Sequence, residues 1–240
     1  MSRKDLYEEL IRIVEKNIVS EEVRDVVLSI LKEPKITFLT VEAKVDIYES
    51  PAAPKVHHAY PGGLIDHTLA VTSIALKLVD VFKEVYGVQV DRDLVVACAV
   101  LHDIFKFYQY EHNPITGGFR ARSDWYIPHH FAIVAELSKR GASEKLIRCL
   151  SEVHGSTPTS LIESQIVNIA DSVDAKFISR IQDVVWRTCK DLETETDGKL
   201  LAEKVFPQVL RRASILELAR IYHREGKDKL RIYIRELIEK

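Results

Sequence analysis

The sequence has few cysteines, no excess of either charge and no long apolar run. Its three cysteines are far apart and form no C-x-x-C pair, which argues against a disulfide framework and a thiolate zinc site. A formal net charge of −2 argues against a protein that coats nucleic acid through a basic surface. No segment is long and apolar enough to span a bilayer, and the charged first residues do not resemble a signal peptide. We therefore expect a cytoplasmic protein without a membrane partner.

Helical periodicity dominates what the sequence does contain. Hydrophobic residues make up 46% of the chain, and along most of it they recur at the three- and four-residue spacing of amphipathic helices. The proline-containing residues 35–61 are predicted to be an extended crossing segment. The fold class is therefore all-α. We predict two helices before Pro34, a short helix at the end of the chain, and helices between them near residues 62–86, 94–107, 128–140, 143–154, 161–189 and 200–224.

Residues 108–127 form a long connection between two predicted helices. They contain the turn-forming pairs Asn113-Pro114 and Gly117-Gly118. A loop of this length in a compact domain is usually functional, so we predict a short irregular or β-hairpin insertion that covers a site. We expect a single domain with three parts: N-terminal helices and an extended lead-in (residues 1–55), a core unit (56–190), and C-terminal helices packed on it (191–240).

Two adjacent polar residues, His102 and Asp103, follow the apolar run Val95–Leu101. A buried charge is costly unless it is paired or coordinates a metal. A single inward-facing histidine is more often a satisfied core residue, but six inward His and Asp side chains on five predicted helices favour a metal site. Such ligands suit iron, manganese, zinc, nickel or magnesium. The other four candidates, each on the apolar face of its own helix, are His67, His130, His154 and Asp171.

The order and spacing of these residues resemble the HD superfamily of metal-dependent phosphohydrolases. Its defining pattern, H…HD…D, is similar to the series His67, His102-Asp103 and Asp171, and the resemblance extends over roughly residues 56–180. It implies an HD-domain helical bundle. One departure is Phe105, where many relatives carry glycine; this larger side chain crowds the approach to the site.

Family members with two metals have two more histidines between the HD pair and the last aspartate. The resemblance therefore implies two divalent ions, chosen from iron, manganese, nickel and magnesium. His129 competes with His130 for one position, and the apolar periodicity favours His130. The implied ligands are His67, His102, Asp103 and Asp171 for the first ion, and Asp103 as a bridge with His130 and His154 for the second.

The resemblance also implies hydrolysis of phosphate esters, and two metals are typical of a phosphodiesterase. The expected substrate is a nucleotide-like or 2′,3′-cyclic phosphate ester, with a pterin cyclic phosphate among the candidates, and the expected nucleophile is a metal-activated hydroxide. Asp103 and Lys106 are the expected catalytic residues. Lys106 lies one helical turn beyond Asp103 and can contact the substrate phosphate; its alternative role is that of a surface lysine at a helix end.

Four further residues are candidates for substrate binding. The resemblance includes the stretch from His57 to Leu64 and places His58 at the rim of the pocket. Arg120 and Arg122 alternate on the predicted hairpin and can hold phosphate, unless they form a solvated loop pair. Asp174 lies one turn after Asp171, where it can contact substrate, orient a ligand or form a surface ion pair.

Three other functions stay open. A one-metal 5′-nucleotidase or phosphomonoesterase predicts that His130 or His154 is not a ligand. A 3′–5′ exoribonuclease-like protein fits the proline-rich lead-in, but no added nucleic-acid-binding domain is evident, so a small phosphate ester is preferred over nucleic acid. A non-catalytic nucleotide sensor is least favoured, because no metal ligand is missing. Amphipathic helices near both ends of the sequence can form the face of a homodimer.

Overall fold

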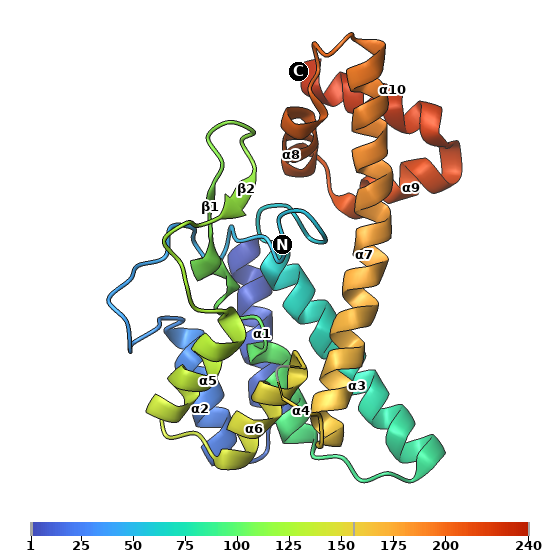
Figure 1. Ribbon diagram of the computed structural model, residues 1–240. Helices are drawn as coiled ribbons and strands as arrows, with labels where there is room; N and C mark the ends of the chain where they lie inside the picture. Colours follow the sequence, from blue (N-terminus) through green and yellow to red (C-terminus); the bar gives the residue numbers. More distant parts are fainter. Residues whose placement is uncertain (1, 156, 240) are drawn as a thin grey trace.

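The computed structural model describes residues 2–155 and 157–239. Within them the chain forms ten α-helices, a short 3₁₀ helix and a two-stranded sheet (Figure 1). The predicted all-α fold is confirmed. In chain order the elements are α1 (Arg3–Asn17), α2 (Glu21–Lys32), α3 (Gly63–Tyr86), α4 (Arg92–Leu101), the 3₁₀ helix (Lys106–Gln109), β1 (Tyr110–His112), β2 (Phe119–Ala121), α5 (His129–Lys139), α6 (Glu144–Val153), α7 (Ile162–Glu195), α8 (Ala202–Arg212), α9 (Ile215–Glu225) and α10 (Lys227–Glu239).

Local side-chain chemistry sets several helix ends. The Asp91 side chain accepts a hydrogen bond from the backbone N–H of Leu94 at 3.2 Å and caps α4, as such residues do at helix starts. Gly87 has a φ of 65° and ends α3, because a left-handed residue at this position closes the last turn. Helix α3 ends at the predicted residue 86, and α4 begins two residues before the predicted residue 94.

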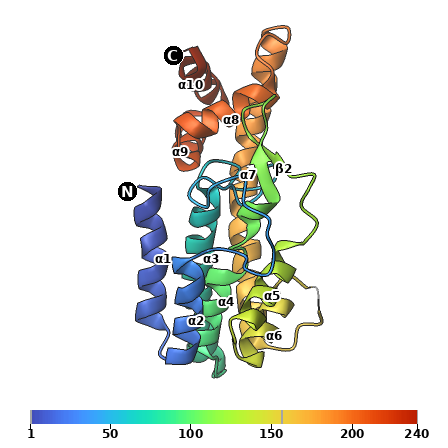
Figure 2. The same cartoon turned by 90° about the vertical axis from the view of Figure 1, so that its left-hand side faces the viewer.

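Helix α4 lies at the centre of the first of two hydrophobic cores. Its residues from Leu94 to Leu101 are all buried, and α1, α2, α3, α6 and α7 pack around it (Figure 2). It ends well before the predicted residue 107. His102 occupies its C-cap, so the chain turns away there and presents His102 and Asp103 to the ends of the neighbouring helices.

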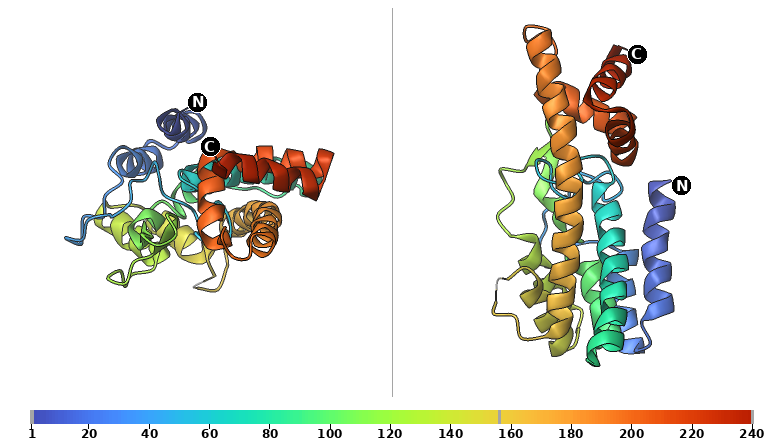
Figure 3. Two further views of the ribbon diagram at one scale, coloured as in Figure 1. Left: turned by 90° about the horizontal axis from the view of Figure 1, so that it is seen from above. Right: turned by 90° about the vertical axis from the view of Figure 1, so that its right-hand side faces the viewer.

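Helix α7 connects the two cores. Its first half packs beside α3 and α4, and its second half carries α8, α9 and α10 (Figures 1 and 3). The second core contains side chains from Ile178 to Ile234 and also Ala59 and Tyr60 from the lead-in. The C-terminal helices therefore pack on the far half of α7 and on the segment that precedes α3.

The prediction of one helix over residues 200–224 was wrong. The chain breaks between α8 and α9, and the Ser214 side chain accepts a hydrogen bond from the backbone N–H of Glu217 at 3.1 Å. Ser-x-x-Glu is a capping-box pattern that marks a helix start. The signal was present in the sequence but was outweighed by continuous apolar periodicity.

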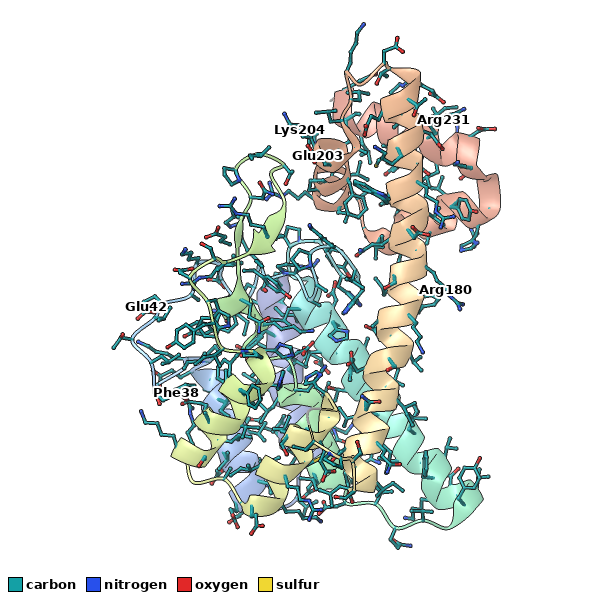
Figure 4. All side chains as sticks on the ribbon, viewed as in Figure 1. Phe38, Glu42, Arg180, Glu203, Lys204 and Arg231 are labelled. Carbon is teal, nitrogen blue, oxygen red and sulfur yellow. The ribbon has the colours of Figure 1, made fainter. Side chains whose placement is uncertain are left out.

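The insertion between α4 and α5 is a hairpin, as predicted. Its antiparallel strands pair Tyr110 with Ala121 and His112 with Phe119. The lead-in is extended and loops outward at Phe38 and Glu42 (Figure 4). None of the helices in the described part of the chain is both long and apolar enough to cross a membrane.

Candidate metal centre

Six His and Asp side chains converge where α3, α4, α5, α6 and α7 meet. They form two sets of three, and within each set the potential ligand atoms lie within 4.8 Å of one another. We call them the first and second groups. The first group is His67, His102 and Asp171, and the second group is Asp103, His129 and His154.

The first group is built on two long helices and the end of α4. His67 is fully buried on α3, in phase with the buried Val71 and Ala75. Its Nε2 lies 3.1 Å from Oδ1 of Asp171 on α7. His102 is also fully buried at the C-cap of α4. These positions follow from the packing of α3 and α7 against α4.

Asp103 belongs to the second group and also faces the histidines of the first. Its Oδ2 is 3.3 Å from Nε2 of His67 and 3.5 Å from Nε2 of His102. Its Oδ1 is 3.1 Å from Nε2 of His129 and 3.5 Å from Nε2 of His154. Each carboxylate oxygen therefore faces a different pair of histidines, which is the arrangement expected of a carboxylate that bridges two cations.

Several buried polar atoms at this centre have no hydrogen-bond partner among the residues that the structure describes. They are Nε2 of His67, His102 and His129 and both carboxylate oxygens of Asp103. Leaving a buried polar atom unpartnered is costly, and native structures rarely do so. Lone pairs of imidazole and carboxylate that converge without thiolates suit a divalent cation of the iron, manganese, nickel or magnesium type. The side chains present therefore fit a metal centre.

Outer hydrogen bonds hold the ring of each ligand histidine. Nδ1 of His67 lies 2.7 Å from Oδ2 of Asp174, and Nδ1 of His102 lies 2.8 Å from the carbonyl oxygen of Ala99. When Nδ1 donates to such an acceptor, Nε2 keeps its lone pair free and aimed at a metal. This pattern is typical of metal-binding histidines.

The second group has a similar outer contact at His129. Its Nδ1 lies 3.1 Å from the amide nitrogen, Nε2, of Gln109 on the 3₁₀ helix. The orientation of a glutamine amide is an assignment from the hydrogen-bond network, so the amide oxygen can equally accept from Nδ1–H. In that orientation Nε2 of His129 is free to bind a cation.

The carboxylates of the centre are held in their ionised forms. Burial opposes ionisation of Asp103, but the charges of Lys106 and His102 outweigh it and hold the pKa of Asp103 well below its usual range. For Asp171, burial is likewise outweighed, mainly by the neighbouring His67, and the pKa of Asp171 falls to about 2. The centre thus presents negative charge to a cation.

The histidines respond to the same surroundings in two ways. Burial lowers the pKa of His102, His129 and His154, which favours the neutral form that binds metals. Burial also opposes protonation of His67, but the surrounding carboxylates, Asp103 first, outweigh it and raise the pKa of His67 to about 10. A divalent cation placed among these carboxylates would take over the role of that proton.

The structure places His129, and not His130, against Asp103 and His154, which corrects the prediction of His130. Helix α5 starts at His129, and its buried residues are Ala132, Ile133, Glu136 and Leu137. These four residues follow His129 by three, four, seven and eight positions, so His129 lies on the same inner face of the helix. His130 and Val134, from the predicted stripe, are only partly buried.

The predicted substrate contacts are largely engaged with other groups. His58 is 3% exposed, and its two ring nitrogens contact Tyr60 Oη and Asp174 Oδ2, each at 2.8 Å. Asp174 also contacts Nδ1 of His67. His58 and Asp174 therefore hold the His67 ring on the side away from Asp103. Lys106 is 14% exposed and contacts Asp103 Oδ2 at 2.5 Å. It is the predicted contact that lies directly at the centre.

The two hairpin arginines hold the insertion in place. Arg120 forms an ion pair with Glu111 on the paired strand at 2.7 Å. Arg122 is buried, pairs with Asp124 at 3.0 Å and donates to the carbonyl oxygen of Glu42 at 2.8 Å. Its guanidinium group therefore attaches the hairpin to the lead-in and is not free to hold phosphate.

Comparison with known proteins agrees with this geometry. Residues 64–176 match the HD domain family. The chain is also 37% identical to dihydroneopterin 2′,3′-cyclic phosphate phosphodiesterase from Methanocaldococcus jannaschii, over 97% of this chain and 90% of the relative. The chain belongs to the HD-domain family. This HD-domain protein is accordingly a metal-dependent phosphohydrolase, as predicted.

Bacterial exoribonucleases are more distant relatives. The HD-domain protein is 28% identical to the 3′–5′ exoribonuclease YhaM from Bacillus subtilis, over 61% of this chain and 50% of the relative. The YhaM protein from Bacillus velezensis is 27% identical over 69% of this chain and 56% of the relative. The chain thus spans little more than half the length of these enzymes. No solved structure gives a significant match.

Proposed function

We propose that this HD-domain protein is a phosphodiesterase that hydrolyses a small 2′,3′-cyclic phosphate ester, with a pterin cyclic phosphate as the leading substrate. The observation that carries the proposal is that the ligand side chains form two groups and that Asp103 faces the histidines of both. Support for the substrate comes from the relative named for such an ester, which matches 97% of this chain, including the C-terminal helices.

The proposed centre holds two divalent cations. When bound, such ions neutralise phosphate charge and lower the pKa of water enough to supply a nucleophile near neutral pH. The protein's part is to fix their ligands and to keep the surroundings dry. The proposed ligands are His67, His102, Asp103 and Asp171 for one ion, and Asp103, His129 and His154 for the other.

Lys106 is the proposed phosphate contact. Its Nζ lies 2.5 Å from Oδ2 of Asp103, and its side chain is partly exposed at the centre. A fixed positive charge beside the reacting phosphate stabilises charge that develops on oxygen as the ester bond breaks. Asp103 holds the ammonium group in place, so Lys106 needs little reorganisation when substrate binds.

Two of the alternative functions are less well supported. A one-metal phosphomonoesterase does not account for His129 and His154, whose Nε2 atoms both face Oδ1 of Asp103. An exoribonuclease is suggested by the match to YhaM, but that match covers only 50% of the relative. The formal net charge of −2 also gives little electrostatic attraction for an RNA strand.

A substrate and metal screen tests the proposal. Protein stripped with a chelator would be reloaded separately with iron(II), manganese, nickel or magnesium. It would then be assayed on dihydroneopterin 2′,3′-cyclic phosphate, a 2′,3′-cyclic nucleotide, a 5′-mononucleotide and a short RNA. We expect the two cyclic esters to be cleaved and the mononucleotide to be resistant. Preferential hydrolysis of the mononucleotide would contradict the proposal, and preferential shortening of RNA would favour the exoribonuclease.

A further inference from the structure

One histidine beside the metal centre has no role in the ligand groups. His57 lies on the lead-in, and only 8% of its surface is exposed. Its ring centroid is 4.9 Å from that of His67. Its Nδ1 is buried and has no hydrogen-bond partner within residues 2–155 and 157–239. A buried imidazole nitrogen without a partner, next to a centre that binds a ligand, indicates that the ligand supplies the partner.

A third cation at His57 is not favoured by the neighbouring nitrogens. His57, His58 and His67 can be grouped as a possible metal cluster by distance. However, both nitrogens of His58 are bonded to Tyr60 and Asp174, and Nδ1 of His67 is bonded to Asp174. Nε2 of His67 belongs to the first group. Among these three residues only His57 then has a nitrogen left over, and one free imidazole does not make a metal site.

The backbone around His57 is held firmly in an unusual shape. His58 has a φ of 47°, in the left-handed region that residues with side chains rarely adopt. A β-bridge joins His57 to Ala53, and the backbone N–H of Ala59 donates to Oε1 of Gln182 on α7 at 2.8 Å. Strained backbone persists where its surroundings over-determine it, and such positions cluster at functional sites.

Glycine at position 63 makes this shape possible. A Cβ at Gly63 would lie 2.1 Å from the carbonyl oxygen of His58, which is too close for any side chain. Tyr60 packs at the same time into the second core. The start of α3 and the C-terminal helices together therefore fix the turn that carries His57. The second core therefore helps to position His57 beside the metal centre.

We propose that His57 donates a hydrogen bond to a phosphate oxygen of the substrate, beside Lys106. The inference rests on the proposed function, because it takes a phosphate ester as the ligand of the centre. An imidazole carries at least one N–H donor whether it is neutral or protonated. The His57 ring lies beside that of His67, whose Nε2 is 3.3 Å from Oδ2 of Asp103. Lys106 contacts the same carboxylate oxygen, so the His57 ring and the ammonium group lie close to the same part of the centre.

The test compares His57→Phe, which removes the donor, with His57→Gln, which keeps one. His112→Phe is the matched control, because His112 is half exposed on the hairpin. In metal-loaded protein we expect His57→Phe to weaken binding of inorganic phosphate about 10-fold, the scale of a lost hydrogen bond to a charged group. The kcat/KM for a 2′,3′-cyclic nucleotide should fall by roughly 10- to 100-fold. His57→Gln should recover part of both losses.

Two results would overturn the inference. One is unchanged phosphate affinity in His57→Phe, and the other is a loss of bound metal from that variant, which would make His57 a ligand. Metal content and phosphate binding are measured without turnover, so they decide the role of His57 even if cyclic esters are not hydrolysed. Should phenylalanine prevent folding, His57→Ala gives the same two readouts.

Discussion

The histidines of the first and second ligand groups differ in how the fold holds them. His67 and His102 are fully buried, on or directly after helices that pack in the first core. His129 and His154 are 16% and 17% exposed, at the first residue of α5 and the C-cap of α6. Side chains in a packed interior move little, whereas helix ends are less constrained. We therefore expect the first group to bind its cation more tightly and the second to exchange it faster.

Removing the shared ligand should have the largest effect. In Asp103→Asn both groups lose the carboxylate that faces them, so we expect neither ion to be retained and activity to fall by at least ~10³-fold, well beyond the loss of one outer partner. The side chain keeps its shape, so the circular dichroism spectrum should be unchanged. Elemental analysis and turnover measure the two effects. Retention of one full equivalent of metal would show that the groups do not share Asp103.

The next largest effect should separate His129 from His130. In His129→Ala we expect loss of one metal per chain and about a 100-fold or larger fall in kcat, because removing a ligand costs more than the 10- to 100-fold of an outer partner. His130→Ala is the matched control and should keep its metal and most of its activity. The reverse pattern would restore the assignment made from sequence periodicity.

The sequence predicted the first group because its helices have regular apolar faces. His67 shares a face with the buried Val71 and Ala75 on α3, and Asp171 follows the buried Val167 on α7. The apolar run before His102 shows in the same way that α4 is buried on all sides. Residues in such segments can be assigned to the interior by counting turns.

His129 of the second group could not be predicted in the same way, because a buried charge on the inner face of α5 hides the apolar pattern of that face. Glu136 is fully buried, accepts a hydrogen bond from the backbone N–H of Thr37 at 2.8 Å and pairs with Arg140 at 2.8 Å. Phe131, in contrast, is 56% exposed. A prediction that counts apolar residues as buried therefore places the inner face of α5 in the wrong position and selects His130. One partner of Glu136, Thr37, comes from a distant segment, and no local pattern shows this contact.

A smaller effect is expected from the outer contact of the first group. Asp174→Asn removes the charge that holds Nδ1 of His67 at 2.7 Å. We expect metal affinity at the first group to fall by between about 10- and 100-fold, the usual cost of losing such a partner. Competition with a chelator measures it. The control is Asp183→Asn, which alters only an exposed pair with Arg187 on the same helix. Equal losses in both variants would point to a general effect of charge and not to orientation of His67.

The smallest effect should come from the corresponding contact of the second group. Gln109 holds Nδ1 of His129 at 3.1 Å with a neutral amide, which orients the ring but adds less basicity than a carboxylate does. We expect Gln109→Ala to weaken the second cation by roughly 10-fold, at the lower end of the range for outer partners. Gln165→Ala, on the exposed surface of α7, is the matched control. Chelator competition should show that the loss is confined to the faster-exchanging ion. A loss of the first ion in Gln109→Ala would mean that the two groups respond as one unit, and the contrast between them would then lie only in their exposure.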